Sequence, residues 1–171
     1  MGIRYTINES VPKPSTTFYA YADTDFANSR DCISMAGYTF LLNNGVITWN
    51  SKKQNKVTTS AAEAKYASIA QVTKEATWLQ NLFLELGFPQ RKPTIIFSDN
   101  QSALAIGHNY QYHSRSQQFN TKNHCIHEKI KQKVINVWYC PTSQMTADIM
   151  TKPLPREASC WHIANLGMTL A

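Results

Sequence analysis

Cysteine is scarce in this chain, and its few thiols form no recognisable site. The 171 residues contain four cysteines, and no two of them stand in a Cys-x-x-Cys pair. This scatter predicts neither a structural zinc site nor a disulfide framework. We therefore expect reduced thiols in an intracellular protein. The four are Cys32, Cys125, Cys140 and Cys160.

Long apolar runs, internal repeats and low-complexity tracts are also missing from the sequence. A membrane-spanning helix needs about 20 consecutive, mostly apolar residues, and no run comes near that length, so we expect no membrane partner. Only 16% of the residues are charged whereas 43% are hydrophobic, which is typical of a folded protein and not of a disordered one. A chain of this length fits one domain.

Acidic residues are fewer than basic ones. Eleven Asp and Glu stand against seventeen Lys and Arg, which gives a formal net charge of +6. A positive surface attracts polyanions over long range and gains from counterion release. Nucleic acid is therefore the first candidate partner, with a basic surface that serves only solubility as the alternative.

Turn residues and apolar periodicity divide the chain into elements. Residues 1–16 carry Pro12 and Pro14 without periodicity, and we expect them to be a lead-in to a domain over residues 17–171. The Asn44-Gly45 pair predicts a hairpin turn with positive φ angles. Apolar residues recur at three- and four-residue steps before Gly87, which predicts a long helix. Strands are expected over 17–22, 37–42, 46–49, 93–98 and 134–140, and helices over 60–86, 101–108, 120–132, 144–150 and 156–166, with 51–56 as a basic loop.

This order of elements predicts an α/β fold. The first strands would be antiparallel, and the later ones would join a mixed sheet through helical crossovers. In such sheets, ligands bind at the carboxyl ends of the strands. Asp23 and Asp99 directly follow two expected strands, so we expect both at that edge.

Four acids suggest metal chemistry, although each also has an ordinary structural explanation. Two Mg²⁺ ions held roughly 3.5–4 Å apart can activate a water and stabilise the leaving oxygen of a phosphodiester, and they need several carboxylate ligands. Asp23 and Asp99 could equally be turn residues, and Asp148 a solvated helix residue. Glu63 could close a capping box with Ser60.

Five motifs, in order, resemble the ribonuclease H domain of copia-type retrotransposon polyproteins. The resemblance runs from about Tyr19 to Gly167, nearly the whole chain, and residues 2–5 (GIRY) resemble the segment that joins the reverse transcriptase to that domain. The motifs are YADTDFA at 21–27, GVITW at 45–49 with SKKQ at 51–54, SAAEA at 60–64, SDNQSA at 98–103, and ADIMTKPLP at 147–155.

The resemblance implies a ribonuclease H-like fold with a mixed five-stranded sheet flanked by helices. It places the family's catalytic, metal-binding acids at Asp23, Glu63, Asp99 and Asp148. The implied activity is hydrolysis of RNA in an RNA–DNA hybrid with two Mg²⁺ or Mn²⁺ ions, leaving a 3′-hydroxyl and a 5′-phosphate. A reverse transcriptase domain is the implied protein partner. The implied location is the cytoplasm, in a virus-like particle, with the nucleus as the alternative.

Departures from the family pattern support an alternative function. Residues 32–36 (CISMA) and 117–120 (QQFN) stand where the family has more charged runs, and Lys65 replaces a second acid beside Glu63. A decayed or domesticated copy could be a non-catalytic nucleic-acid-binding module. Four intact acids argue against it, because drift has no reason to spare them.

Polar residues beside the acids are the predicted contacts of the nucleic acid. Lysines bind phosphates, and we favour this role over a merely solvated loop. The aromatic residues Trp49, Trp78, Trp138 and Tyr139 could stack on bases, but we expect all four in the core. The predicted nucleic-acid contacts are Lys52, Lys53, Asn55, Lys56, Asn100 and Ser102.

Overall fold

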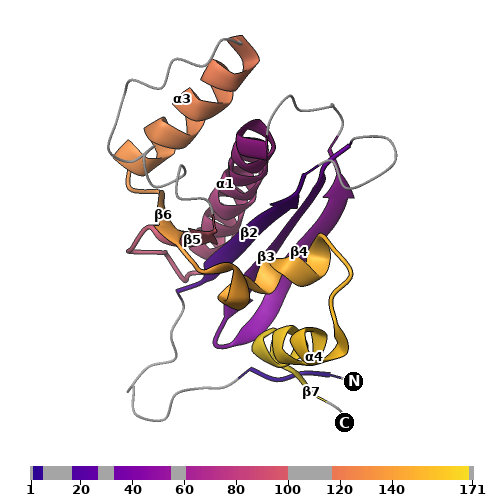
Figure 1. The fold of residues 1–171 in the computed structure, drawn as a ribbon. Helices are drawn as coiled ribbons and strands as arrows, with labels where there is room; N and C mark the ends of the chain where they lie inside the picture. Colours follow the sequence, from indigo (N-terminus) through magenta and orange to yellow (C-terminus); the bar gives the residue numbers. More distant parts are fainter. Residues whose placement is uncertain (1, 6–16, 27–32, 55–60, 100–116, 170–171) are drawn as a thin grey trace.

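A five-stranded mixed sheet is the centre of the fold. The computed structural model describes residues 2–5, 17–26, 33–54, 61–99 and 117–169. The strand order is β4-β3-β2-β5-β6 (Figure 1). β3 pairs antiparallel with β2 and β4, whereas β5 runs parallel to β2 and β6, which confirms the expected α/β fold. The strands are β2 (Tyr19–Asp25), β3 (Met35–Leu42), β4 (Gly45–Lys53), β5 (Thr94–Ser98) and β6 (Ile135–Tyr139).

The turn between β3 and β4 differs from its prediction by one residue. Asn43 and Asn44 take φ angles of 51° and 61°, so they are the central pair of the turn, and Gly45 already belongs to β4. Asparagine tolerates the left-handed region better than most residues. Gly45 has a different role, because a Cβ atom there would lie 2.5 Å from the ring of Tyr5.

The long helix α1 (Ala61–Glu85) contains neither glycine nor proline and confirms its prediction. It ends in a Schellman motif: Gly87, at φ 86°, donates its N–H to Leu84 O, and Phe88 donates to Phe83 O. The other helical segments are α3 (Gln117–Lys131), η1 (Thr142–Gln144), η2 (Thr146–Met150) and α4 (Arg156–Asn165).

Three predicted elements differ from the structure or lie outside its described residues. The segment 51–56 was expected to be a loop, but β4 continues through Lys53, because residues 51–53 pair with residues 35–37 of β3. The expected helix over 144–150 is present as the 3₁₀ turns η1 and η2. The expected helix over 101–108 lies outside the described residues.

Side chains on the two faces of the sheet belong to different clusters. Ala20 and Ala22 of β2 pack in the main core with Ile69 of α1. Tyr21, between them in sequence, points to the other face and packs with Met145 and Ala147 around η1 and η2. Successive residues of a strand alternate between faces, so Asp23 shares the face of Tyr21. In Figure 1, α1 covers one face of the sheet, and η2 and α4 lie on the other.

Ordered structure begins earlier than the sequence suggested. β1 (Gly2–Ile3) pairs antiparallel with β7 (Met168–Thr169), and Arg4 N–H donates to Gly167 O at 2.7 Å. The Tyr5 hydroxyl donates to Val46 O at 2.9 Å. Residues 2–5 are therefore attached to the body of the domain, while a boundary at residue 16 stays a prediction.

Candidate active site

Asp23 lies on β2 near the centre of the sheet, and only 4% of its surface is exposed. Its Oδ2 accepts a 2.5 Å hydrogen bond from Thr151 Oγ1, and its backbone carbonyl accepts one from Ser68 Oγ of α1. β2 thus presents this carboxylate while the neighbouring elements fix its orientation.

Gly37 allows η2 to lie directly against the sheet beside Asp23. Gly37 of β3 lies directly opposite Asp23 of β2 in the sheet. A Cβ atom on Gly37 would lie 2.6 Å from Met150 Cβ and 2.8 Å from Thr151 Cγ2, closer than real Cβ atoms approach. Ser51 Oγ of β4 donates to Met150 O at 2.6 Å. The absent side chain and this bond together bring η2, and with it Asp148, to Asp23.

Asp148 is buried, and its surroundings raise its pKa. It is 4% exposed, and its Oδ1 is buried without a hydrogen-bond partner among the described residues. Its Oδ2 pairs with Lys152 Nζ at 2.8 Å. The pKa of Asp148 is raised to about 6, chiefly by burial and also by the neighbouring Asp23 carboxylate, while Lys152 lowers it. Two neighbouring carboxylates with an unsatisfied oxygen favour a bound cation.

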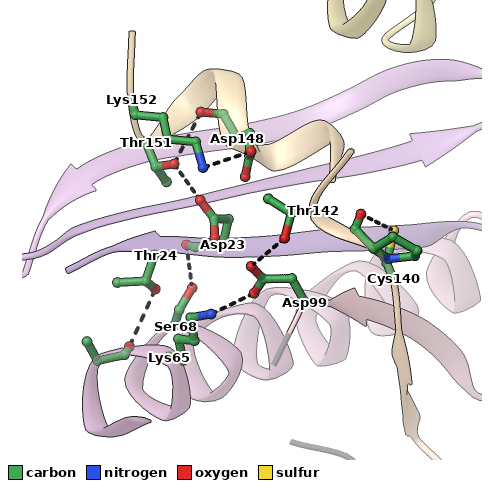
Figure 2. Close-up of polar contacts among 12 residues, drawn as sticks. Asp23, Thr24, Lys65, Ser68, Asp99, Cys140, Thr142, Asp148, Thr151 and Lys152 are labelled. Atoms are coloured by element: carbon green, nitrogen blue, oxygen red, sulfur yellow. Dashed lines mark hydrogen bonds and ion pairs between the residues drawn. The ribbon is translucent and has the colours of Figure 1, made fainter. Parts of the chain in front are cut away.

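Asp99, directly after β5, is held by other groups. Its Oδ1 pairs with Lys65 Nζ of α1 at 2.8 Å, and its Oδ2 accepts a 3.4 Å hydrogen bond from Thr142 Oγ1. Figure 2 shows Asp148, Thr151 and Lys152 grouped beside Asp23, and Asp99 facing Lys65 and Thr142. Asp99 is 14% exposed at its side chain, so water reaches this part of the site.

The four predicted acids do not form one compact group. Among the described residues, no three His, Cys, Asp or Glu side chains lie together closely enough to hold a metal ion. Asp23 and Asp148 lie beside each other (Figure 2), and the Asp99 carboxylate pairs with Lys65. Glu63 is half-buried in the first turn of α1. Its predicted cap partner, Ser60, lies outside the described residues.

The predicted nucleic-acid contacts are described only in part. Lys52 and Lys53 are exposed on β4, an edge strand, and they follow Ser51, which bonds to η2. Because successive residues of a strand alternate between faces, Lys53 shares the face of Ser51 and Asp23, and Lys52 lies on the other face. Asn55, Lys56, Asn100 and Ser102 lie outside the described residues.

The expectation of buried aromatic residues was wrong. Trp49, Trp78, Trp138 and Tyr139 are 56%, 55%, 51% and 42% exposed. The strands β4 and β6 that carry three of them are the edges of the sheet, where residues pack against fewer neighbours than at its centre. Trp138 still contacts Phe97 edge to face, with ring centroids 6.3 Å apart.

Sequence reasoning missed the residues that hold the acids. Thr151 and Lys152 lie in a motif used for the resemblance, but only their proximity to Asp23 and Asp148 reveals what they do. Thr142 and Gly37 carried no signal, because their contacts join segments far apart in sequence. Lys65 was noted as a departure from the family, and its contact with Asp99 was not expected.

Asp23 and Asp148 are chemically suited to bind a divalent cation. They supply hard oxygen donors, and one of these oxygens is buried without a partner among the described residues. Asp99 fits less well, because both of its oxygens already have partners. The arrangement can hold a cation at the carboxyl end of β2, beside an exposed basic strand.

The sequence is similar to transposon polyproteins of plants. It is 34% identical over 154 residues to the retrovirus-related Pol polyprotein from transposon RE1 of Arabidopsis thaliana, covering 90% of this chain and 10% of the polyprotein. It is 35% identical over 138 residues to that from transposon TNT 1-94 of Nicotiana tabacum, covering 80% and 10%. The chain therefore spans about a tenth of these relatives. No family model matches it.

Solved ribonuclease H structures share the fold. The N-terminal ribonuclease H domain of a Mycobacterium tuberculosis protein superposes with a TM-score of 0.59 at 12% identity, over 88% of this chain and 98% of that one. LC11 ribonuclease H1, isolated from compost, gives 0.59 at 13% identity, over 80% and 94%. The same enzyme in complex with an RNA/DNA hybrid gives 0.54 at 13% identity, over 79% and 94%.

The sequence relatives and the structural neighbours point to the same kind of domain. No helix in the described part of the chain is long and apolar enough to cross a membrane. The five-stranded mixed sheet and the match to ribonuclease H structures confirm the expected fold class. The chain is thus homologous to a segment of copia-type retrotransposon Pol polyproteins, and its fold is that of ribonuclease H.

Proposed function

We propose that this chain is a ribonuclease H module that hydrolyses the RNA strand of an RNA–DNA hybrid with divalent metal ions. The observation that carries the proposal is the neighbouring pair Asp23–Asp148 at the carboxyl end of β2 (Figure 2), with a buried oxygen of Asp148 that has no partner among the described residues. Homology to Pol polyproteins supports the same function, as does the hybrid bound to LC11 ribonuclease H1.

The proposed metal donors are Asp23 and Asp148, with Asp99 and Glu63 as the other acids of a two-ion site. When bound, Mg²⁺ or Mn²⁺ would supply Lewis-acid stabilisation of the phosphodiester and lower the pKa of an attacking water. The protein's own side chains orient the donors: Thr151 fixes Asp23 Oδ2, and Lys152 fixes Asp148 Oδ2. Lys152 also offsets part of the repulsion between the two carboxylates.

The substrate would approach from the side of β4. Lys52 and Lys53 are exposed there and suited to phosphates, and the wide minor groove of a hybrid displays the 2′-hydroxyls that distinguish RNA from DNA. By homology, the reverse transcriptase segment of a Pol polyprotein is the proposed partner, and the cytoplasm, within a virus-like particle, is the proposed location.

The test is cleavage of a labelled RNA–DNA hybrid by the purified chain. We expect cleavage only with Mg²⁺ or Mn²⁺, and a loss of at least about a hundredfold in Asp23→Asn, because removing one charged donor weakens both metal binding and transition-state stabilisation. Glu85→Gln, at an exposed site at the far end of α1, is the matched control and should keep full activity. Cleavage in EDTA, or full activity in Asp23→Asn, would refute the mechanism. Cleavage by Glu63→Gln decides whether Glu63 belongs to the site: lost cleavage would support a metal-binding role, and full activity would exclude one.

A non-catalytic nucleic-acid-binding module is the second candidate function. The ion pairs Lys65–Asp99 and Lys152–Asp148 favour it, because each places an ammonium on a proposed metal donor. Binding and cleavage should be measured on the same hybrid. Tight binding without cleavage in either metal would support this candidate against the enzyme.

A further inference from the structure

We propose that Lys65 is a built-in cation that takes the place of a metal ion at Asp99, so that the native chain without nucleic acid binds a divalent ion only at the Asp23–Asp148 pair. The inference rests on the proposed function in treating the acids as a metal site. It goes beyond that function by assigning a different counter-ion to each half of the site.

Lys65 lies on the face of α1 that packs against the sheet. Ser68 Oγ donates to Asp23 O at 3.2 Å, so this face of the helix lies against the carboxyl end of β2. Lys65 is three residues before Ser68 and shares its face, because residues three apart are neighbours on a helix. Glu63 is two residues before Lys65, a rotation of about 200° at 3.6 residues per turn. The residue that α1 presents to Asp99 is therefore a lysine.

Lys65 and Asp99 form an ion pair. Lys65 Nζ lies 2.8 Å from Asp99 Oδ1, with 25% of the lysine side chain and 14% of the aspartate side chain exposed. Thr142 Oγ1 donates to the other oxygen, Oδ2. Both Asp99 oxygens are thus engaged by donors that a metal ion would have to displace. A divalent ion beside Asp99 would also meet the positive charge of the lysine.

The Asp23–Asp148 half of the site is compensated less completely than Asp99. Lys152 also bonds to an acid, Asp148, but only to Oδ2. Asp148 Oδ1 stays buried without a partner among the described residues, and the carboxylate of Asp23 lies beside Asp148 (Figure 2). The Asp23–Asp148 pair therefore keeps a free donor and excess negative charge. At Asp99 one acid faces one lysine, and the charges already balance.

The test measures Mn²⁺ binding to the isolated chain without nucleic acid, by calorimetry and by electron paramagnetic resonance of the bound ion. We expect one bound ion in the native chain. Lys65→Glu should bind a second ion or bind Mn²⁺ about tenfold more tightly, because it exchanges a competing cation for a carboxylate ligand. Lys65→Met, which removes the ammonium without adding a carboxylate, should lie between the two and serves if Lys65→Glu is poorly folded. Lys74→Glu, an exposed change of equal charge on the same helix, should behave like the native chain.

Asp99→Asn locates the effect. In the native background, Asp99→Asn should change the affinity for Mn²⁺ by less than about threefold, because Lys65 already neutralises Asp99. In the Lys65→Glu background it should abolish the gain in Mn²⁺ binding, since neighbouring sites are not additive. Two bound ions in the native chain, or unchanged binding in both Lys65→Glu and Lys65→Met, would overturn the proposal. Hybrid cleavage on the same samples separates the two ideas. If Mn²⁺ binding increases in the Lys65 variants but no variant cleaves the hybrid, the role of Lys65 stands and the proposed function fails. If the native chain cleaves the hybrid but Mn²⁺ binding does not depend on residue 65, the proposed function stands and the role of Lys65 fails.

Discussion

At the scale of single residues, the site depends on how each carboxylate is compensated. Asp23 accepts a hydrogen bond from a hydroxyl group. Asp99 pairs with an ammonium and accepts a hydrogen bond from a hydroxyl group. Asp148 pairs with an ammonium through one oxygen only. Burying a charged group is costly unless other groups compensate it. The incomplete compensation of Asp148 therefore makes its protonation state sensitive to pH.

Replacing Asp148 by Asn should flatten the pH dependence of stability. The pKa of Asp148 is about 6 in the folded chain against an ordinary value of 3.8, so the folded state binds this proton more tightly than the unfolded state. The free energy of unfolding of the native chain should then fall as pH rises from about 4 to about 6. Asp148→Asn lacks this loss and should be the more stable protein above pH 6. Urea unfolding in EDTA at a series of pH values measures it, and an unchanged slope in the variant would contradict the assignment.

Thr151→Val should loosen Asp23 without changing the size of the side chain. The variant loses the hydroxyl that donates to Asp23 Oδ2, and we expect a loss of about 1.5–3 kcal/mol of stability, the scale of a hydrogen bond to a charged group, together with weaker Mn²⁺ binding. Thr151→Ser keeps the hydroxyl and is the control. Equal unfolding free energies for the valine and serine variants would show that the bond contributes nothing.

At the scale of elements, the site depends on the close approach of η2 to β3. Gly37 makes this approach possible, because a Cβ atom would overlap Met150 and Thr151. Position 37 is thus a structural requirement of the site although it carries no functional group.

Gly37→Ala should push η2 away from the sheet. Overpacking of this kind costs about 1–3 kcal/mol, and Asp148 would move away from Asp23, so we expect lower stability and weaker Mn²⁺ binding together. Gly2→Ala is the matched control, because no atom lies within 4 Å of a Cβ built there. Thermal unfolding and calorimetry check both variants. Native-like metal binding in Gly37→Ala would mean that η2 can adapt.

The exposed end of β4 should bind phosphates of the hybrid. Lys52→Ala with Lys53→Ala should lower the slope of log affinity against log salt by about one unit for each lost contact. Lys74→Ala with Lys92→Ala removes the same charge at exposed positions on α1 and before β5. Fluorescence anisotropy over a range of salt concentrations measures both. Equal slopes for the two double variants would remove β4 from the binding surface.

At the scale of the whole molecule, local patterns predicted the elements better than the site. The periodicity before Gly87 located α1, and the apolar runs before Asp23 and Asp99 located β2 and β5, because those signals lie within single segments. The contacts of Thr151 with Asp23, and of Lys65 with Asp99, join residues far apart in the chain, so no local pattern contains them. The exposed Trp49 and Trp138 show the same limit: their hydrophobicity is local, but their place at the sheet edges depends on strand order.

The pairing of β1 with β7 determines how the molecule responds to a mechanical load. Gly2 faces Thr169, and Ile3 faces Met168, so a force applied through the segments outside these strands would act first at the Gly2–Thr169 end. The two strands would then separate like a zipper, one hydrogen bond after another, instead of shearing all bonds at once. Until the pair has separated, such a force passes through it, and only afterwards does it load β2 and η2, which carry Asp23 and Asp148.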